Sequence, residues 1–111
     1  MTSMKKYILI YHNKISTKQP SPEEMKKGMD VWMAWFGTFG KQMVDGGNPF
    51  APSAKAVTAK GVETVSATQW QATGYTIINA ESMDEAVKIA KTCPVLHDAE
   101  GSVRVYEALP M

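Results

Sequence analysis

The sequence predicts an α+β domain in which two capped helices separate groups of strands. Residues 21–24 and 82–85 both show the Ser-x-x-Glu spacing of a capping box, which places the start of a helix after each serine. Residues 7–11, 74–79 and 102–107 form short runs rich in β-branched and aromatic side chains, as strands do. A chain of 111 residues is long enough for one domain with its own core.

The first helix is expected to run from Pro22 to the glycine pair Gly46-Gly47. Its apolar side chains recur every three or four positions and therefore form one stripe. The stripe consists of Met25, Met29, Trp32, Met33, Phe36, Phe39 and Met43. Gly46 is the expected left-handed residue at the helix end, and Pro49 prevents the helix from resuming. We expect this aromatic stripe to lie across a sheet.

A hairpin or strand pair is predicted between the helices, with strands at 54–59 and 62–66 joined by a turn at Lys60-Gly61. The strand at 74–79 and the helix after Ser82 follow. We interpret the order as strand, helix, hairpin or strand pair, helix, strand, which gives βαββαβ, the ferredoxin-like pattern, in which both helices cover one face of an antiparallel sheet. The other face stays bare, and a bare apolar face needs a partner. We therefore expect a homodimer.

Charge and cysteine content exclude several classes of protein. Twelve basic and eleven acidic residues nearly cancel and are mixed along the chain, which argues against nucleic-acid binding. The single cysteine, Cys93, excludes an internal disulfide and favours a reducing compartment, and we interpret it as a small buried hydrophobe. The sequence shows neither a secretory signal nor a membrane span. We expect a cytoplasmic protein.

Motifs spread over nearly the whole chain resemble one known family. They are Lys5–Tyr11, Ser21–Met25, Trp35–Gly37, Asp45–Gly47, Ser82–Val87 and Cys93-Pro94. Together they resemble the YCII-related family, also called the DGPF-domain family. The resemblance implies that residues 1–111 form a single YCII-related domain, a ferredoxin-like subunit that pairs into a dimeric α+β barrel. The Asp-Gly-Pro-Phe signature is absent near residues 63–71, which places the chain in a subgroup without it.

His12 and Asp45 are the candidate catalytic residues. His12 follows the first strand directly, and an imidazole there can act as a general base near neutral pH. Asp45 lies at the expected end of a helix, where the helix dipole disfavours a carboxylate, so it can have a role beyond the helix. The alternatives are an exposed loop histidine and an aspartate that only forms a turn. Some YCII-related proteins have been proposed to use a His and Asp pair.

The candidate ligand-binding residues are Tyr11, Trp35, Asn48, Arg104 and Tyr106. Arg104 and Tyr106 share one face of the last strand, and they point into a dimer cleft if the intervening valines pack under the helices. An arginine there can bind a carboxylate or an enolate-like group. A surface ion pair with Glu63 or Glu107 is the alternative for Arg104, and core packing is the alternative for Trp35.

Isolated among polar residues, Trp70 is expected to contact the partner of a dimer. The sequence contains no metal-ligand cluster, phosphate loop or nucleophile elbow, so neither a metal nor a cofactor is expected. We predict a homodimer that binds a small apolar or anionic molecule in its intersubunit cleft. The alternatives are a cofactor-free isomerase-like or lyase-like enzyme that uses His12 and Asp45 and, from the resemblance alone, an accessory protein in transcriptional control.

Overall fold

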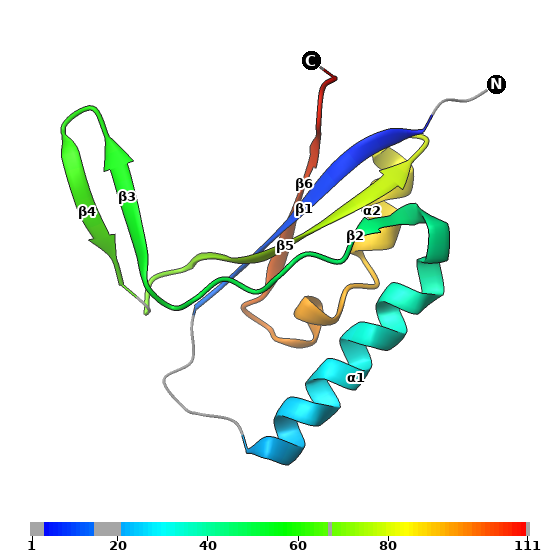
Figure 1. Cartoon of the computed structure of the whole chain (residues 1–111), viewed down its shortest axis with the longest axis horizontal. Helices are drawn as coiled ribbons and strands as arrows, with labels where there is room; N and C mark the ends of the chain where they lie inside the picture. Colours follow the sequence, from blue (N-terminus) through cyan, green and yellow to red (C-terminus); the bar gives the residue numbers. More distant parts are fainter. Residues whose placement is uncertain (1–3, 15–20, 67, 111) are drawn as a thin grey trace.

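The computed structural model describes residues 4–14, 21–66 and 68–110. They form an α+β protein with two helices, an antiparallel four-stranded sheet and a separate hairpin (Figure 1). The elements in chain order are β1 (Lys5–Asn13), α1 (Pro22–Phe39), the 3-10 turn η1 (Gly40–Gln42), β2 (Met43–Asp45), β3 (Ala54–Thr58), β4 (Gly61–Val65), β5 (Gln71–Ala80), α2 (Met83–Ala90), the 3-10 turn η2 (Pro94–His97) and β6 (Ser102–Glu107).

The four-stranded sheet has the order β2-β5-β1-β6, and all neighbouring strands are antiparallel. The central strand β1 pairs with β5 on one side and with β6 on the other, and its register with β5 shifts between Tyr11 and His12. Strands β3 and β4 pair only with each other, in a second sheet of two strands. The hairpin expected from the sequence is confirmed, but it stands apart from the main sheet.

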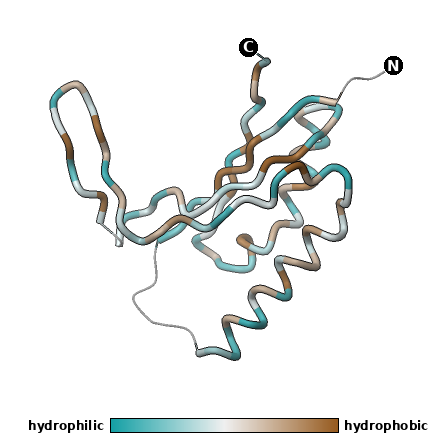
Figure 2. Tube along the Cα trace, in the orientation of Figure 1, coloured by the Kyte–Doolittle hydropathy of each residue, from teal (hydrophilic) through white to brown (hydrophobic). Residues whose placement is uncertain are grey.

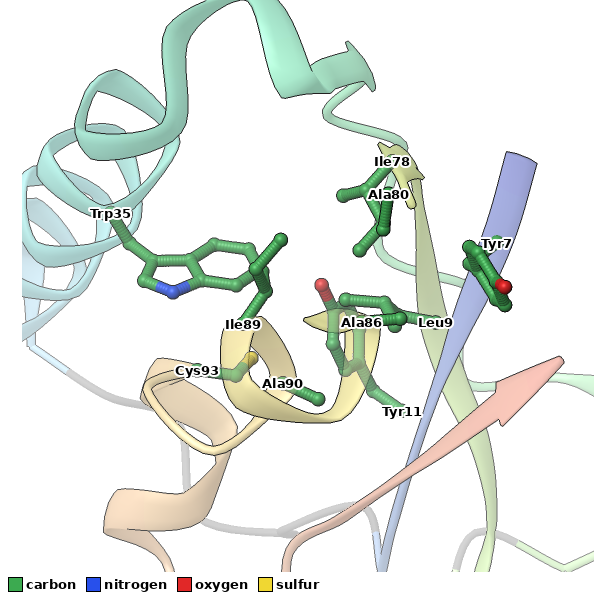
Figure 3. Close-up of a cluster of buried hydrophobic side chains, with 10 residues drawn as sticks. All are labelled: Tyr7, Leu9, Tyr11, Trp35, Ile78, Ala80, Ala86, Ile89, Ala90 and Cys93. Carbon is green, nitrogen blue, oxygen red and sulfur yellow. The ribbon is translucent and has the colours of Figure 1, made fainter. Parts of the chain in front are cut away.

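Both helices pack on the same face of the sheet. Side chains of β1 alternate along the strand, so that Tyr7, Leu9 and Tyr11 are buried and the residues between them are half-buried. The core gathers these side chains with residues of β5, α1 and α2 (Figure 3). Its members are Tyr7, Leu9, Tyr11, Trp35, Ile78, Ala80, Ala86, Ile89, Ala90 and Cys93. The opposite face of the sheet has no helix over it in the described part of the chain (Figure 1).

Helix α1 is shorter than predicted, and the prediction that Gly46 ends it is wrong. The helix ends at Phe39, and Gly40 takes the left-handed backbone (φ 50°) that reverses the chain. The residues after η1, Met43–Asp45, then form the edge strand β2, although they continue the helical stripe in the sequence. The reason is that pairing of Met43–Asp45 satisfies backbone groups on the edge of β5, which a longer helix would leave unpaired.

The apolar stripe of α1 packs over only half of its length. Trp32, Phe36 and Phe39 are half-buried, whereas Met25, Met29 and Met33 are 58%, 67% and 63% exposed. Figure 1 shows that the first turns of α1 extend away from the sheet. The expectation that the whole stripe lies across the sheet is therefore wrong for the N-terminal half.

The predicted helix starts are confirmed at both helices. The hydroxyl of Ser21 accepts a hydrogen bond from the backbone N–H of Glu24, and Ser82 accepts one from Glu85, each at 3.2 Å. Within the described ranges, neither helix has the length and apolar character needed to span a membrane.

Candidate functional site

A cavity of about 500 Å³ opens between helix α1 and the end of the sheet where β2 leads into the next segment. Met29, Trp32, Met33 and Phe36 form its wall on the helix side. These four residues are three or four positions apart, so they lie on one side of the helix. The two methionines sit where α1 extends beyond the sheet, which explains why they are exposed.

The helix wall is held in place by aromatic contacts with the core. The ring of Trp32 lies edge-on to Tyr11 with centroids 5.1 Å apart, and it also contacts Trp35 at 5.8 Å. Phe36 completes the cluster, with its ring centroid 5.9 Å from that of Trp32. Aromatic pairs in such arrangements attract each other beyond the area they bury. The wall is thus formed before any ligand binds.

The second wall is the segment 46–49, and it depends on glycine. Gly47 has a positive φ of 76°, and a Cβ there would overlap the carbonyl oxygen of Tyr75. A Cβ on Gly74 would lie 3.1 Å from the carbonyl oxygen of Asn48. The carboxylate of Asp45 accepts a hydrogen bond from the Gly47 N–H at 2.9 Å and so closes the turn. Close approach of this segment to β5 creates the cavity.

The floor of the cavity carries a buried hydroxyl chain. Tyr11 donates a hydrogen bond to Thr76, whose own hydroxyl donates to the carbonyl oxygen of Gly46 at 2.9 Å. Burial raises the pKa of the Tyr11 phenol well above its ordinary value. Burial likewise raises the pKa of the Cys93 thiol to about 11. Both groups are therefore neutral at physiological pH.

The cavity is apolar and carries no formal charge. Among the described residues that line it, none is acidic, basic or histidine. The polar residues of its lining include Asn48 with a side-chain amide, Thr73 with a hydroxyl and Tyr11 with a phenol. Because transfer of an ion into such surroundings is costly without a counter-charge, the cavity suits an uncharged molecule.

The structure places the predicted ligand-binding residues in three different environments. Tyr11 and Asn48 line the cavity. Trp35 instead lies in the core at 6% exposure, and its indole N–H donates to the hydroxyl of Thr92 at 2.9 Å. Arg104 and Tyr106 lie on the other face of the sheet, since they pair in register with the half-buried side of β1. A single chain does not bring these five residues together.

His12 and Asp45 are not neighbours. Asp45 pairs with Ile77, which in turn pairs with Ile8, four residues from His12 on β1. Their Cα atoms are therefore separated by about 13 Å along the strands and by about 10 Å across them. Nδ1 of His12 lies 3.3 Å from the carbonyl oxygen of Ile10, and the carboxylate of Asp45 bonds its own turn. In one chain, the predicted acid–base pair does not form.

His12 instead takes part in a stack on the bare face of the sheet. The imidazole lies on the indole of Trp70, with centroids 4.6 Å apart and planes at 21°. The guanidinium carbon of Arg104 lies 5.3 Å from the centroid of the same indole, at the distance of a cation–π contact. Glu107, one expected partner of Arg104, pairs with Lys5 at 3.7 Å.

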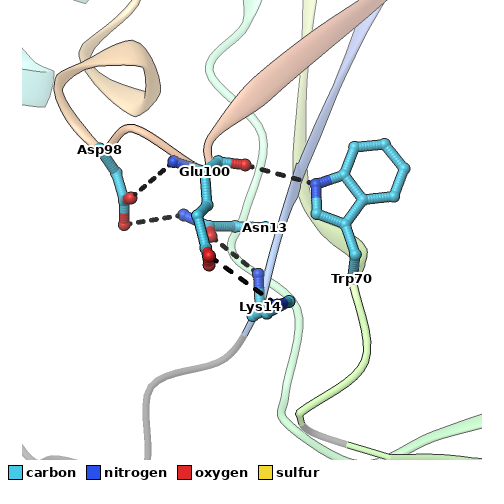
Figure 4. A network of polar contacts seen from close by, with 5 residues as sticks. All are labelled: Asn13, Lys14, Trp70, Asp98 and Glu100. Carbon is cyan, nitrogen blue, oxygen red and sulfur yellow. Dashed lines mark hydrogen bonds and ion pairs between the residues drawn. The ribbon is translucent and has the colours of Figure 1, made fainter.

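A polar network fixes Trp70 at the end of the sheet (Figure 4). The indole N–H donates to the carbonyl oxygen of Glu100 at 3.3 Å, and the N–H of Glu100 donates to Asp98 at 3.0 Å. The side-chain amide of Asn13 donates to the same carboxylate at 3.1 Å. The Glu100 N–H and then the Asn13 amide lower the pKa of Asp98, because both stabilise the carboxylate.

Most cavity residues were not selected as site residues from the sequence, among them Trp32, Phe36, Gly47, Gly74 and Tyr75. A local signal existed for the first two, because aromatic residues at i and i+4 share one side of a helix. For the glycines, the Gly-Gly pair indicated only a chain reversal, and nothing local indicated the contact with β5.

In the ranges that the structure describes, no three His, Cys, Asp or Glu residues gather to hold a metal ion. No protein-family model matches this chain, and a search of curated proteins finds no match either.

Proposed function

We propose that the protein binds a small, uncharged, largely apolar molecule in the cavity between α1 and the sheet. The observation that carries this proposal is the uncharged lining of a cavity of about 500 Å³. Small-molecule sites are commonly of this size and combine apolar walls with a few polar groups. The cavity is lined by elements of one chain, so the ligand does not need an intersubunit cleft.

The aromatic lining favours a planar ligand. Trp32 and Phe36 contribute ring surfaces, and rings bind flat apolar groups through offset or edge contacts. Met29 and Met33 add flexible thioether side chains that adapt to the outline of a ligand. Between the apolar and anionic ligands expected from the sequence, the uncharged lining favours the apolar one.

A matched pair of fluorescent dyes tests the proposal. N-phenyl-1-naphthylamine is uncharged, and 8-anilinonaphthalene-1-sulfonate has the same ring system with a sulfonate added. We expect saturable binding of the uncharged dye, and binding of the sulfonate at least about tenfold weaker, because its charge finds no counter-charge. Equal affinity for the two dyes would contradict the proposal.

Two variants of one helix locate the dye. Met33→Trp fills the cavity from its exposed wall, whereas Met25→Trp places the same side chain on α1 outside the lining. We expect Met33→Trp to weaken binding of N-phenyl-1-naphthylamine about tenfold or more and Met25→Trp to leave it unchanged. An equal effect of both variants would show that the dye binds elsewhere.

Ligand binding is favoured over catalysis by the positions of the two candidate catalytic residues. His12 lies on the face of the sheet opposite the cavity, stacked on Trp70, and Asp45 closes the turn beside Gly47. No feature of the described residues supports an accessory role in transcriptional control.

A ferredoxin-like topology is part of the same proposal. If the hairpin β3–β4 is an insertion, the remaining strands β1, β2, β5 and β6 alternate with the helices as βαββαβ. Numbered without the hairpin, the strands lie in the sheet in the order second, third, first and fourth. All neighbours are antiparallel, and both helices lie on one face. This order and the motifs named above support a place among YCII-related proteins.

A homodimer is proposed from the surface that one chain leaves exposed. The chain exposes 8167 Å², whereas a compact monomer of 12.2 kDa exposes about 6,100 Å². Its radius of gyration of 15.5 Å likewise exceeds the value of about 13 Å for a compact domain of 111 residues. A second copy on the bare sheet face would cover Ile8, Ile10 and Ile77 and give a dimeric α+β barrel.

A further inference from the structure

The hairpin β3–β4 leaves the body of the molecule. Its strands pair with each other from Ala54–Val65 to Thr58–Gly61 and with no strand of the main sheet. Figure 1 shows it rising on the side of the sheet opposite α1, so that hairpin and sheet form the two sides of an open angle. A two-stranded hairpin alone is marginally stable in water, because it has no face to bury.

The hairpin carries an exposed apolar pair. Val57 and Val62 lie directly opposite each other in register, and they are 75% and 64% exposed. Figure 2 shows a hydrophobic segment on each strand of the hairpin. Directly opposed β-branched residues share one face of a strand pair, so these two side chains make one continuous apolar surface.

The base of the hairpin is fixed to the main sheet. The N–H of Phe50 donates to the carbonyl oxygen of Thr73 at 2.8 Å, and the Phe50 ring stacks on Tyr75 with centroids 5.9 Å apart. On the other side, the side-chain amide of Gln71 donates to the carbonyl oxygen of Ser66 at 2.8 Å. The hairpin is therefore held at both ends in a set direction from β5.

We propose that the β3–β4 hairpin is a dimerisation arm, and that a second copy of this chain fills the angle between the arm and the bare sheet face. In a two-fold dimer each arm meets the same surface of the other subunit, so both Val57–Val62 pairs are covered. This inference rests on the homodimer proposed above and adds the element that holds it together.

The exposed area supports a second copy as the occupant. The chain exposes roughly 2,000 Å² more than a compact monomer of its mass. A standard interface buries about 800 Å² of each partner, so the excess is large enough for both the sheet face and the arm. The arm carries Lys55, Lys60 and Glu63, a mixture of signs that gives no field for nucleic acid.

Two variants test the arm in the full-length protein. The double variant Val57→Asp/Val62→Asp places charges on the exposed pair, where the folded chain alone has room for them. Val31→Asp is the control: Val31 is exposed on α1, which lies on the other side of the sheet from the arm, and it does not line the cavity. We expect the double variant to raise the dimer dissociation constant about a hundredfold, and Val31→Asp to leave it unchanged, by sedimentation equilibrium.

Hydrogen exchange gives a second measurement that does not depend on a variant. The backbone N–H groups of 54–65 should be protected at protein concentrations where the dimer forms and lose that protection on dilution. A dimer that the double variant leaves intact, or arm N–H groups that exchange freely within a dimer, would overturn the arm while leaving the dimer in place. A wild-type monomer at high concentration would overturn both, and the dye-binding test of the cavity would be unaffected.

Discussion

Replacing Gly47 by alanine should destabilise the protein and distort the cavity at once. Gly47 has a φ of 76°, and its Cβ would overlap the carbonyl oxygen of Tyr75. The left-handed backbone alone costs a non-glycine residue about 1–2 kcal/mol. The overlap is with backbone, so the segment must move away from β5.

That movement strains the hydrogen bonds that hold the segment to the sheet. They join Thr76 to the carbonyl oxygen of Gly46 at 2.9 Å and the N–H of Phe50 to Thr73 at 2.8 Å. Each bond contributes about 1 kcal/mol net. With the backbone term, loss of one or both gives a total of about 2–4 kcal/mol, a large part of the stability of a small domain.

Urea unfolding followed by tryptophan fluorescence measures this loss, with Gly28→Ala as the matched control. Gly28 lies inside α1 with nothing within 4 Å of a Cβ, so alanine there should stabilise the protein by about 0.5–1 kcal/mol. Gly47→Ala should also weaken binding of N-phenyl-1-naphthylamine. A Gly47→Ala protein within about 0.5 kcal/mol of wild type would refute the reasoning.

Two further predictions concern the core. Because burial raises the pKa of Cys93 from 9.0 to about 11, the folded state keeps a proton that the unfolded chain loses. The contribution of this proton to the free energy of unfolding is then fully present below about pH 9 and falls by on the order of 1–2 kcal/mol towards about pH 11. In urea unfolding, Cys93→Ala should show a smaller fall of the free energy of unfolding over this pH range. Thr92→Val removes the acceptor of the Trp35 indole N–H and should cost about 1–3 kcal/mol by thermal unfolding, whereas Thr92→Ser keeps the hydroxyl and should cost much less.

The parts of the fold that were predictable are those set by local chemistry. A helix cap depends on residues within one turn of the chain, and the hydroxyls of Ser21 and Ser82 both form the predicted capping bond. The last strand, 102–107, was predicted with its observed bounds because its alternation follows a loop rich in turn residues. Such signals are contained within a few neighbouring residues.

Strand β2 was not predictable, because its residues satisfy two local patterns. Met43 continues the helical stripe of α1 and also fits a short edge strand. Gly40 and Gly46 are both able to end a helix, and the choice of Gly40 is made by the free edge of β5, about thirty-five residues later in the chain. Where tertiary pairing determines the end of a helix, the local sequence does not indicate it.

One chain does not bring the candidate site residues together, and the register of β1 and β6, which the sequence does not specify, is the reason. As predicted, Arg104 and Tyr106 share one face of β6, and the valines lie on its other face. However, Tyr11 pairs with Val103, and alternation therefore puts it on the helix-covered side, away from Arg104. A shift of one residue in that register would have put Arg104 and Tyr106 on the face of Tyr11 and the valines on the other face.

This alternation also separates the two activities proposed for the protein. Tyr11 points into the cavity and His12, the next residue, stacks on Trp70 on the bare face. The proposed ligand site and the proposed dimer interface therefore involve different side chains of the same strand. Coupling between them would have to pass through the backbone of β1, at the point where its register with β5 shifts. It follows that Met33→Trp should leave the dimer intact and Val57→Asp/Val62→Asp should leave dye affinity per subunit unchanged.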